Sequence, residues 1–455
     1  MSRQGNRRLF LLLPLAIAAA LALVAATVLP HDAPRVAAVG ENSLTSPDGA
    51  DVTGEFASLK LDDDGFPVVA YLANLPAFPF SRQVRLLRCD DVNCAGSGES
   101  VEVVTSSGFG ILSPSLTLDG VGNPVISYSM GNTFGVTVVH CNDANCAGGD
   151  ESSVTYLAGA IISESRHVLD SNGLPVVFFR GDGMQMLRCA NPNCTTLSND
   201  PNFLIQPGNS YTYSFALDAA GFPVIGYIGN NTGIGGDLML LHCNDLNCAG
   251  GDESNLVVDG TTIGGLKIWF HTALALVGGN PVIAYSHADL SPLKVARCDD
   301  PNCAAGGDSI EFATTGLGNG SPGIAIDANG FPIVSFYRSL GGTRVLHCND
   351  AACAGGDESE QLVSSQNGNP SIQGATSILL DGNGFPVVAF FAASPQDLFV
   401  LHCGNANCSP LDTDGDGVPD ATDNCVVTAN PGQLNTDAAN TGANRPGADA
   451  LGDAC

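Results

Sequence analysis

Fourteen of the sixteen cysteines form seven pairs in which four residues separate the partners, and no other feature constrains the fold of this chain as strongly. The first cysteines of successive pairs lie 48 to 55 residues apart. A fixed period of this length is the signature of a repeat architecture, in which each unit buries its apolar face against the next. The pairs are Cys89/Cys94, Cys141/Cys146, Cys189/Cys194, Cys243/Cys248, Cys298/Cys303, Cys348/Cys353 and Cys403/Cys408.

The paired cysteines can be read as zinc ligands or as disulfides. A structural zinc ion takes four ligands, whereas each repeat supplies two cysteines. An export signal at the N-terminus places the chain in an oxidising compartment, where disulfides persist. We therefore predict seven disulfides, each within one repeat. The two cysteines that are left, Cys425 and Cys455, are predicted to pair with each other.

A second segment recurs once per repeat and predicts two strands joined by a tight turn. It contains a glycine, then a proline, then an apolar run that ends at an aromatic residue. The glycine suits a positive φ, and the proline suits the first residue of a strand. The aromatic residues are Tyr71, Tyr128, Phe179, Tyr227, Tyr285, Phe336 and Phe390. Six copies carry an aspartate suited to an Asx turn, Asp62, Asp119, Asp170, Asp218, Asp327 and Asp381, and the fifth has Leu276 instead.

With one strand before the cysteine pair and one after it, each repeat should hold four strands. The content of 55 Gly and 26 Pro, without long amphipathic helical patterns, favours the same all-β class. Seven such units resemble a seven-bladed β-propeller with four-stranded blades. A β-solenoid is the alternative, although its rungs are shorter. The Asp-turn-Gly element is similar to the Asp-box of sialidase-like propellers, which implies the architecture and not the activity.

The seventh repeat lacks a fourth strand of its own, because Cys408 is followed directly by an acidic segment. The stretch from Arg35 to Ser46 is similar in composition to the fourth strands of other repeats. We predict that it pairs with the strand before Cys403 and closes the ring, which leaves no open sheet edge.

The N-terminus carries Arg3, Arg7 and Arg8, followed by an apolar run over 9–29. This pattern predicts a signal peptide over 1–30, with an uncleaved membrane anchor as the alternative, and hence a secreted or cell-surface protein. The net charge of −29 disfavours nucleic acid and anionic membranes as partners. It favours a cation, and Ca²⁺ is the predicted cofactor.

The acidic C-terminal segment has the spacing of a calcium-binding loop. Oxygen-bearing residues stand at positions 1, 3, 5, 9 and 12, with Gly417 at position 6 for the turn. The predicted ligands of this first site are Asp412, Asp414, Asp416, the carbonyl of Val418, Asp420 and Asp423. The last ligand is Asp and not Glu, and Pro419 lies inside the loop, so an EF-hand is not expected.

The same segment resembles a thrombospondin type 3 repeat in its Asp423-Asn424-Cys425, Asn430-Pro431 and Gly452-Asp453-Ala454-Cys455 motifs. That resemblance implies a second calcium ion held by Gln433, Asn435, Asp437 and Asp453. The stretch from Gln433 to Cys455 is longer than in the family, which weakens the second site, and an acidic disordered tail is the alternative. The expected domains are therefore the signal at 1–30, the propeller at 34–410 and an irregular calcium-stabilised module at 411–455.

The sequence-based hypothesis for function is a non-enzymatic adhesion or ligand-binding scaffold, with an extracellular glycan or protein bound by the loops of variable length on one face. Arg180-Gly181-Asp182 in one loop would suit receptor adhesion. The alternative is a hydrolase or lyase acting on extracellular glycans. Charged or aromatic residues that depart from the repeat are the enzyme candidates, Glu164, Arg166, His167, Trp269 and His271. The residue before each first cysteine is His or Arg, which is expected to be an exposed strand position.

Overall fold

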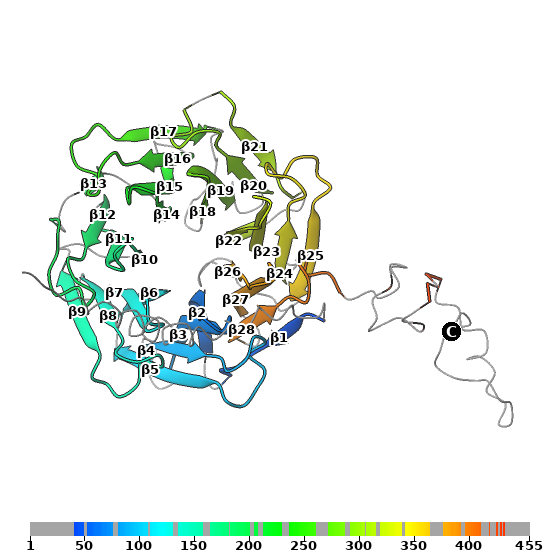
Figure 1. Ribbon diagram of the computed structural model, residues 1–455, viewed down its shortest axis with the longest axis horizontal. Coiled ribbons are helices and arrows are strands. Elements are labelled where there is room, and N and C mark those ends of the chain that lie inside the picture. Colours follow the sequence, from blue (N-terminus) through cyan, green and yellow to red (C-terminus); the bar gives the residue numbers. More distant parts are fainter. Residues whose placement is uncertain are drawn as a thin grey trace, which may run out of the picture. The chain divides into compact units, whose positions relative to one another are not determined.

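The computed structural model shows a ring of seven four-stranded antiparallel sheets (Figure 1). It describes residues 41–410 with gaps between strands, the longest at 261–271 and 365–375, and beyond them Val418, Cys425, 428–429 and 431–432. The chain divides into two units at Ala37/Ala38, and every described residue belongs to the second. The predicted all-β class and the seven-bladed propeller are confirmed.

Each blade runs outward from an inner strand in chain order. Blades 1 to 3 are β2 to β5 (Val52–Leu61, Pro67–Asn74, Arg82–Arg88, Ser100–Ser107), β6 to β9 (Ile111–Leu118, Pro124–Met130, Gly135–His140, Ser152–Leu157) and β10 to β13 (Glu164–Leu169, Pro175–Arg180, Gly183–Arg188, Leu204–Pro207). Blades 4 and 5 are β14 to β17 (Tyr213–Leu217, Pro223–Gly229, Asp237–His242, Ser254–Asp259) and β18 to β21 (Thr272–Val277, Asn280–Ser286, Leu293–Arg297, Ser309–Phe312). Blade 6 is β22 to β25 (Asn319–Ile326, Pro332–Arg338, Gly342–His347, Ser359–Ser364), and blade 7 is β26 to β28 (Ser377–Leu380, Pro386–Ala392, Asp397–His402) with β1 (Ser43–Thr45).

The ring closes as predicted, because β1 pairs with β28 in antiparallel register, Ser43 opposite His402 and Thr45 opposite Val400. Asn42 fixes the joint from the next position: its amide donates to the Cys408 carbonyl, and its side-chain oxygen accepts from the Gly404 amide. The prediction is thus confirmed for β1, and the part of the predicted segment before residue 41 lies outside the described residues.

The turn between the first and second strands of a blade is built by its aspartate. In blade 1, Asp62 Oδ1 accepts hydrogen bonds from the amides of Asp64 and Phe66, and Gly65 has φ 83°. The fifth blade differs because its turn is shorter. There Val277 pairs with Asn280 across two left-handed glycines, so Val277, and not Leu276, stands where the other blades have Asp.

All seven predicted cysteine pairs form disulfides within their blades. The second cysteine of each pair is left-handed, with φ between 50° and 56°. The first cysteine donates its amide to the carbonyl of the proline that begins the second strand, as from Cys89 to Pro67. Each disulfide therefore fastens one local turn to its own sheet.

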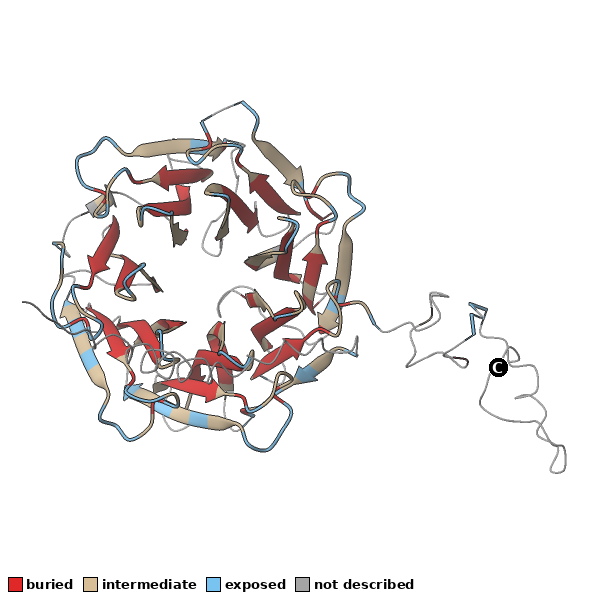
Figure 2. Ribbon diagram, in the orientation of Figure 1, coloured by how far each residue is buried: buried red, intermediate tan, exposed pale blue. Residues whose placement is uncertain are grey.

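The hydrophobic core lies between blades. Seven clusters of buried side chains each draw on two neighbouring blades. Burial is greatest in the three inner strands of the blades, while the outermost strands are partly exposed (Figure 2). Since no blade buries its faces alone, stability requires a closed ring.

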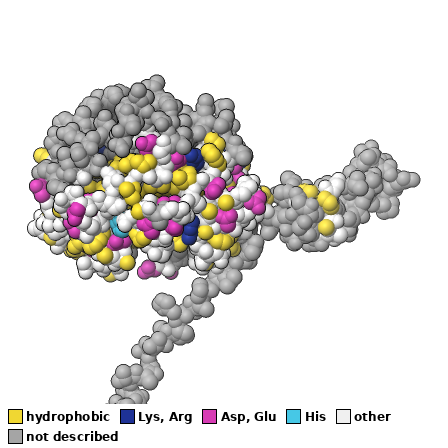
Figure 3. Space-filling view, turned by 90° about the horizontal axis from the view of Figure 1, so that it is seen from above, with side chains coloured by type: hydrophobic (Ala, Val, Ile, Leu, Met, Phe, Trp, Pro, Cys, Tyr) yellow, Lys and Arg dark blue, Asp and Glu magenta, His cyan; other side chains and the backbone are white. Residues whose placement is uncertain are grey.

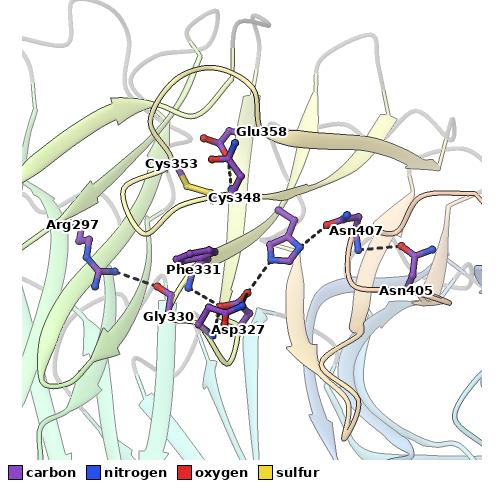
Figure 4. A network of polar contacts seen from close by, with 12 residues as sticks. Arg297, Asp327, Gly330, Phe331, Cys348, Cys353, Glu358, Asn405 and Asn407 are labelled. Atoms are coloured by element: carbon purple, nitrogen blue, oxygen red, sulfur yellow. Dashed lines mark hydrogen bonds and ion pairs between the residues drawn. A yellow bond between two sulfur atoms is a disulfide. The ribbon is translucent and has the colours of Figure 1, made fainter. Parts of the chain in front are cut away.

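The His or Arg before each first cysteine joins adjacent blades, which corrects the expectation of an exposed position. In the junction of Figure 4, His347 Nε2 lies 3.2 Å from Asp327 Oδ2 of its own blade, and Nδ1 lies 2.7 Å from Asn407 Oδ1 of the next. Four junctions share this latch: Asp119–His140–Asn193, Asp218–His242–Asn302, Asp327–His347–Asn407 and Asp381–His402–Asn93.

The other three junctions use an arginine, which reaches backbone carbonyls of the next blade instead of an amide side chain. Arg88 donates to the Ala144 carbonyl, and Arg188 to that of Leu246. Arg297, whose own blade lacks the aspartate, donates to two carbonyls of blade 6, Gly330 and Ala351. The latches therefore run around the whole ring.

Candidate functional site

The candidate site is a polar hollow beside the ring axis, open to solvent and of about 420 Å³ with its mouth included. Inner strands of blades 1, 2 and 3 line it, together with the start of the inner strand of blade 7. The lining residues are Phe56, Ala57, Ser58, Ser113, Pro114, Ser115, Ser165, Arg166, Thr376 and Ser377. They lie toward the beginnings of these strands, so the hollow faces the side where the loops vary in length.

The serines of the hollow hold neighbouring inner strands together. Ser58 Oγ accepts a hydrogen bond from the Leu116 amide at 3.0 Å, and Ser115 Oγ accepts one from the His167 amide at 3.1 Å. Ser377 Oγ does the same for the Leu59 amide at 3.0 Å. Because inner strands of different blades are not paired in one sheet, these hydroxyl bonds fix the wall of the hollow.

Arg166 is the charged side chain among the lining residues, and it is paired with a carboxylate. Its Nε lies 3.0 Å from Glu164 Oε1, with 36% of the arginine side chain and 11% of the glutamate exposed. The strand that carries both is anchored by Tyr213, whose hydroxyl lies 3.3 Å from the Glu164 carbonyl. Burial raises the pKa of Tyr213 well above its usual value, so this phenol stays neutral.

A second carboxylate and arginine lie in blade 1 at the edge of the hollow. Glu55 directly precedes Phe56 and is 3% exposed, and its Oε2 lies 3.4 Å from Arg82 Nη2. Arg82 also donates to Asn74 Oδ1 at 2.9 Å and to the Ile111 carbonyl of blade 2 at 3.2 Å. Of these two Glu–Arg pairs, in blades 1 and 3, Arg166 lines the hollow, and Glu55 precedes the lining residue Phe56 in the chain.

Of the enzyme candidates chosen from the sequence, Arg166 lines the hollow, and Glu164 is its ion-pair partner. His167 is buried at a core position, with Thr117 Oγ1 at 2.7 Å and Ser127 Oγ at 2.9 Å from its ring nitrogens. Burial, with the Lys60 charge, lowers its pKa to about 3, so it is a neutral structural residue. Trp269 and His271 lie outside the described residues.

Two buried triads of tyrosine, aspartate and a cation were missed from the sequence. Asp48 Oδ2 accepts from the Tyr71 hydroxyl at 2.6 Å and from Arg85 at 2.9 Å. The corresponding triad joins Asp259, the last residue of β17 in blade 4, to Tyr285 and Lys294 of blade 5. Burial, with the neighbouring aspartate, raises the pKa of both tyrosines. Arg85 and Lys294 stand directly opposite these tyrosines in register, a placement that the repeat alignment could have revealed. The triads anchor the connections between blades.

The predicted calcium ligands cannot be placed together, because only Val418 among them is described. The other nine, Asp412, Asp414, Asp416, Asp420, Asp423, Gln433, Asn435, Asp437 and Asp453, lie outside the described residues. Cys425 is buried and disulfide-bonded, and its predicted partner Cys455 lies outside them as well. Within the described part, two acidic clusters on the disulfide turns could hold a metal ion, Asp90/Asp91/Glu99 and Asp299/Asp300/Asp308.

The described part of the chain contains no helix of the length and apolarity needed to cross a membrane. The apolar segment 9–29, on which the signal or anchor prediction rests, lies outside it.

No protein-family model and no curated protein sequence matches the chain. Solved structures do match. One is a protein of unknown function from Dyadobacter fermentans, at 11% identity and a TM-score of 0.46, covering 80% of this chain and 98% of that one. Another is a polysaccharide lyase, at 9% identity and a TM-score of 0.47, covering 76% of this chain and 88% of that one. A third is an exo-β-1,3-galactanase from Phanerochaete chrysosporium, at 11% identity and a TM-score of 0.36, covering 68% and 80%.

The hypothesis of a non-enzymatic adhesion scaffold is set aside: the lyase and the galactanase are named as glycan-acting enzymes, although a likeness at these identities and TM-scores concerns the fold and shows no activity of this chain. In the Arg180-Gly181-Asp182 tripeptide, Arg180 is the last residue of β11 and pairs with Met184, and the Gly181 amide donates to the Gly183 carbonyl. Asp182 lies outside the described residues. At such identities the likeness concerns the fold, so the activity must be argued from the hollow itself.

Proposed function

We propose that this protein is a glycan-active enzyme, a glycoside hydrolase that takes a neutral glycan into the hollow between blades 1, 2, 3 and 7. The observation that carries the proposal is the pairing of Arg166 with Glu164 in a wall otherwise made largely of serines. Binding sites for small molecules need a concave surface with a few polar groups of fixed orientation. Hydroxyls, a guanidinium and a carboxylate are suited to the hydroxyl groups of a sugar.

Charge favours a neutral glycan over an acidic one. The chain carries a net charge of −29, and Asp and Glu greatly outnumber Lys and Arg on the described surface in Figure 3. A polyanionic glycan would be repelled as it approached such a surface. The Glu164–Arg166 and Glu55–Arg82 pairs are each neutral as a unit, so the edge of the hollow adds no net positive charge.

Glycoside hydrolysis by the usual route requires two carboxyl groups on either side of the scissile bond. The candidates are Glu164, the ion-pair partner of the lining residue Arg166, and Glu55, which precedes the lining residue Phe56. We assign Glu164 as the candidate acid/base or nucleophile, since Arg166 fixes its orientation and part of its side chain reaches solvent. Glu55, being almost fully buried, is the second candidate and would require the substrate to approach the Phe56 side.

The experiment is a screen of the full chain against neutral and acidic polysaccharides, with released reducing ends and unsaturated products measured in parallel. Reducing ends without unsaturated products, from a neutral glycan, are expected of a hydrolase. Glu164→Gln should abolish the activity without changing the melting temperature. Glu311→Gln, on the outer strand of blade 5, is the matched control and should leave the rate unchanged. Unaltered activity of Glu164→Gln would remove the assignment.

We further propose that the protein is exported and that residues 411–455 form a calcium-binding module of the thrombospondin type 3 kind. The loop spacing from Asp412 to Asp423 and the cysteines at both ends of the segment support it. Without metal the carboxylates repel one another and the segment has few apolar residues, so calcium binding should be coupled to its folding. Calcium titration of the full chain by calorimetry tests this, with Asp414→Ala/Asp416→Ala as the comparison.

A further inference from the structure

We propose that Phe56 is the sugar-stacking platform of the hollow, and that the enzyme selects glycans whose pyranose ring offers an apolar face. This inference rests on the proposed glycan site. Phe56 is the aromatic residue of the hollow lining, and it is half-buried. Its apolar contacts lie on the core cluster between blades 1 and 2, so the phenyl ring lies between that core and the hollow.

The backbone brings Phe56 to the hollow by a break in the strand. The pairing of β2 with β3 shifts in register between Glu55 and Ser58, so Phe56 and Ala57 form a bulge on the innermost strand. Bulges of this kind re-aim side chains and are common next to active sites. Blade 2 has the equivalent break between Leu112 and Ser115. Blade 6 has the same break between Gly320 and Gly323, whereas the inner strands of blades 3, 4 and 5 pair without a shift.

Both bulges carry a strained residue. Phe56 has φ 57° and Ser113 has φ 48°, which is a left-handed conformation that side chains with a Cβ rarely adopt. Among the residues that the structure describes, the other non-glycine residues with positive φ are Gln396 and the second cysteines of the seven pairs. The cysteines are held by their disulfides, whereas Phe56 and Ser113 stand at one shared position of the repeat, in the bulges of two neighbouring blades that line the hollow. Strain of this kind is found at functional sites, where the surrounding structure holds it in place.

The surroundings of Phe56 fit the recognition of a ring that is apolar on one face and polar at its edge. Phe56 supplies a flat apolar surface, while Arg166, with 36% of its side chain exposed, lines the same hollow with hydrogen-bonding groups. A pyranose presents C–H groups on its face and hydroxyls at its rim, so the two kinds of group can be met at once. Stacking against an aromatic ring requires no charged group on the sugar. It therefore suits the neutral substrate that the net charge of the chain favours.

The test uses the neutral oligosaccharide that the parent enzyme cleaves, bound to the inactive Glu164→Gln chain and measured by calorimetry. Phe56→Leu keeps apolar volume and removes the ring, and we expect its affinity to fall about tenfold. Phe56→Tyr keeps the ring and should stay within about threefold. Phe312→Leu, which removes an aromatic ring 59% exposed on the outer strand of blade 5, is the matched control and should bind like its parent.

In the active chain, Phe56→Leu should raise KM by a similar factor and leave the melting temperature close to that of the parent. If the parent binds and cleaves a neutral glycan and Phe56→Leu has the same affinity and KM, the stacking role is overturned and the proposed function stands. A parent that neither binds nor cleaves any glycan would overturn the proposed function together with this inference. If Phe56→Leu unfolds, the Phe56→Tyr and Phe56→Met variants replace it in the test. Affinity that is kept in Phe56→Tyr and lost in Phe56→Met would support stacking, whereas affinity kept in both variants would show that the ring is not needed.

Discussion

The latch between the last blade and the first offers a direct measure of how the ring is held closed. His402 Nε2 lies 3.0 Å from Asp381 Oδ2, and Nδ1 lies 2.9 Å from Asn93 Oδ1 across the closure. The His402 and Asp381 side chains are 9% and 8% exposed, so solvent screens the contact little. A lost hydrogen bond to a charged group costs about 1.5–3 kcal/mol and one to a neutral group about 0.5–1.5 kcal/mol. His402→Ala should therefore lower the free energy of unfolding by about 2–4 kcal/mol.

The assay is guanidinium denaturation of the disulfide-intact chain, followed by circular dichroism. A double-mutant cycle with Asn93→Ala isolates the bond across the closure, and we expect a coupling of about 1 kcal/mol. The cycle of His347 with Asn407, at an internal junction, is the matched control and should give a similar value. Coupling below about 0.5 kcal/mol at both junctions would mean that the two sites are additive and would refute the latch.

The effect of the latch should also depend on pH. Burial alone would raise the pKa of Asp381, but hydrogen bonds from the Phe385 amide, His402 and Asn383 outweigh it, and the pKa is lowered. A carboxylate with a lowered folded pKa stabilises the fold above its ordinary pKa and loses that contribution as the pH falls through the folded value. The difference between the parent and His402→Ala should therefore shrink below about pH 4.

Three further outcomes are expected. Gly54→Ala should destabilise the closure by more than about 2 kcal/mol in the same denaturation assay, because its Cβ would lie 2.5 Å from Leu398 Cα at φ +98°. Glu358→Gln should raise the melting temperature at neutral pH and lose that advantage in acid. Burial first, and then neighbouring aspartates, raise the pKa of Glu358. The charged form of this side chain therefore opposes folding above that pKa. In calorimetry of the full chain, Asp414→Ala/Asp416→Ala should remove the calcium-binding heat, and an unchanged titration would contradict the proposed loop.

The ring, the disulfides and the turn chemistry could be predicted because they repeat. Seven cysteine pairs with the same spacing imply the same local structure in every repeat. A loop of four residues between the partners permits little except a local turn. The fifth turn was misaligned by one residue, since Leu276 was taken for the aspartate position that Val277 occupies. A shortened Gly-Gly turn changes the number of residues without changing the strands around it, and residue counting cannot detect that.

The latches could be predicted from the sequence only in part. The residue before the second cysteine is Asn in each blade that follows a histidine, namely Asn93, Asn193, Asn302 and Asn407. Asn145 and Asn247 occupy the same position in the blades that follow Arg88 and Arg188, and those arginines reach backbone carbonyls instead. The asparagine therefore does not reveal which junctions take a histidine and which an arginine.

The hollow could not be predicted, because it is formed by residues that depart from the repeat on blades that only the closed ring brings together. Glu164 and Arg166 were recognised as departures from the pattern, but their relation to blades 1 and 7 depends on the closed ring. The bulge at Phe56 has no sequence signature, since a phenylalanine before Ala57 and Ser58 continues an ordinary strand pattern. Asymmetry is needed all the same: a substrate cannot be oriented by seven equal blades, and the left-handed residues Phe56 and Ser113 and the Glu164–Arg166 pair fall on blades that line the hollow. The latches, disulfides and Asx turns hold the other ends of these strands, so the irregular end can carry strain without loosening the ring.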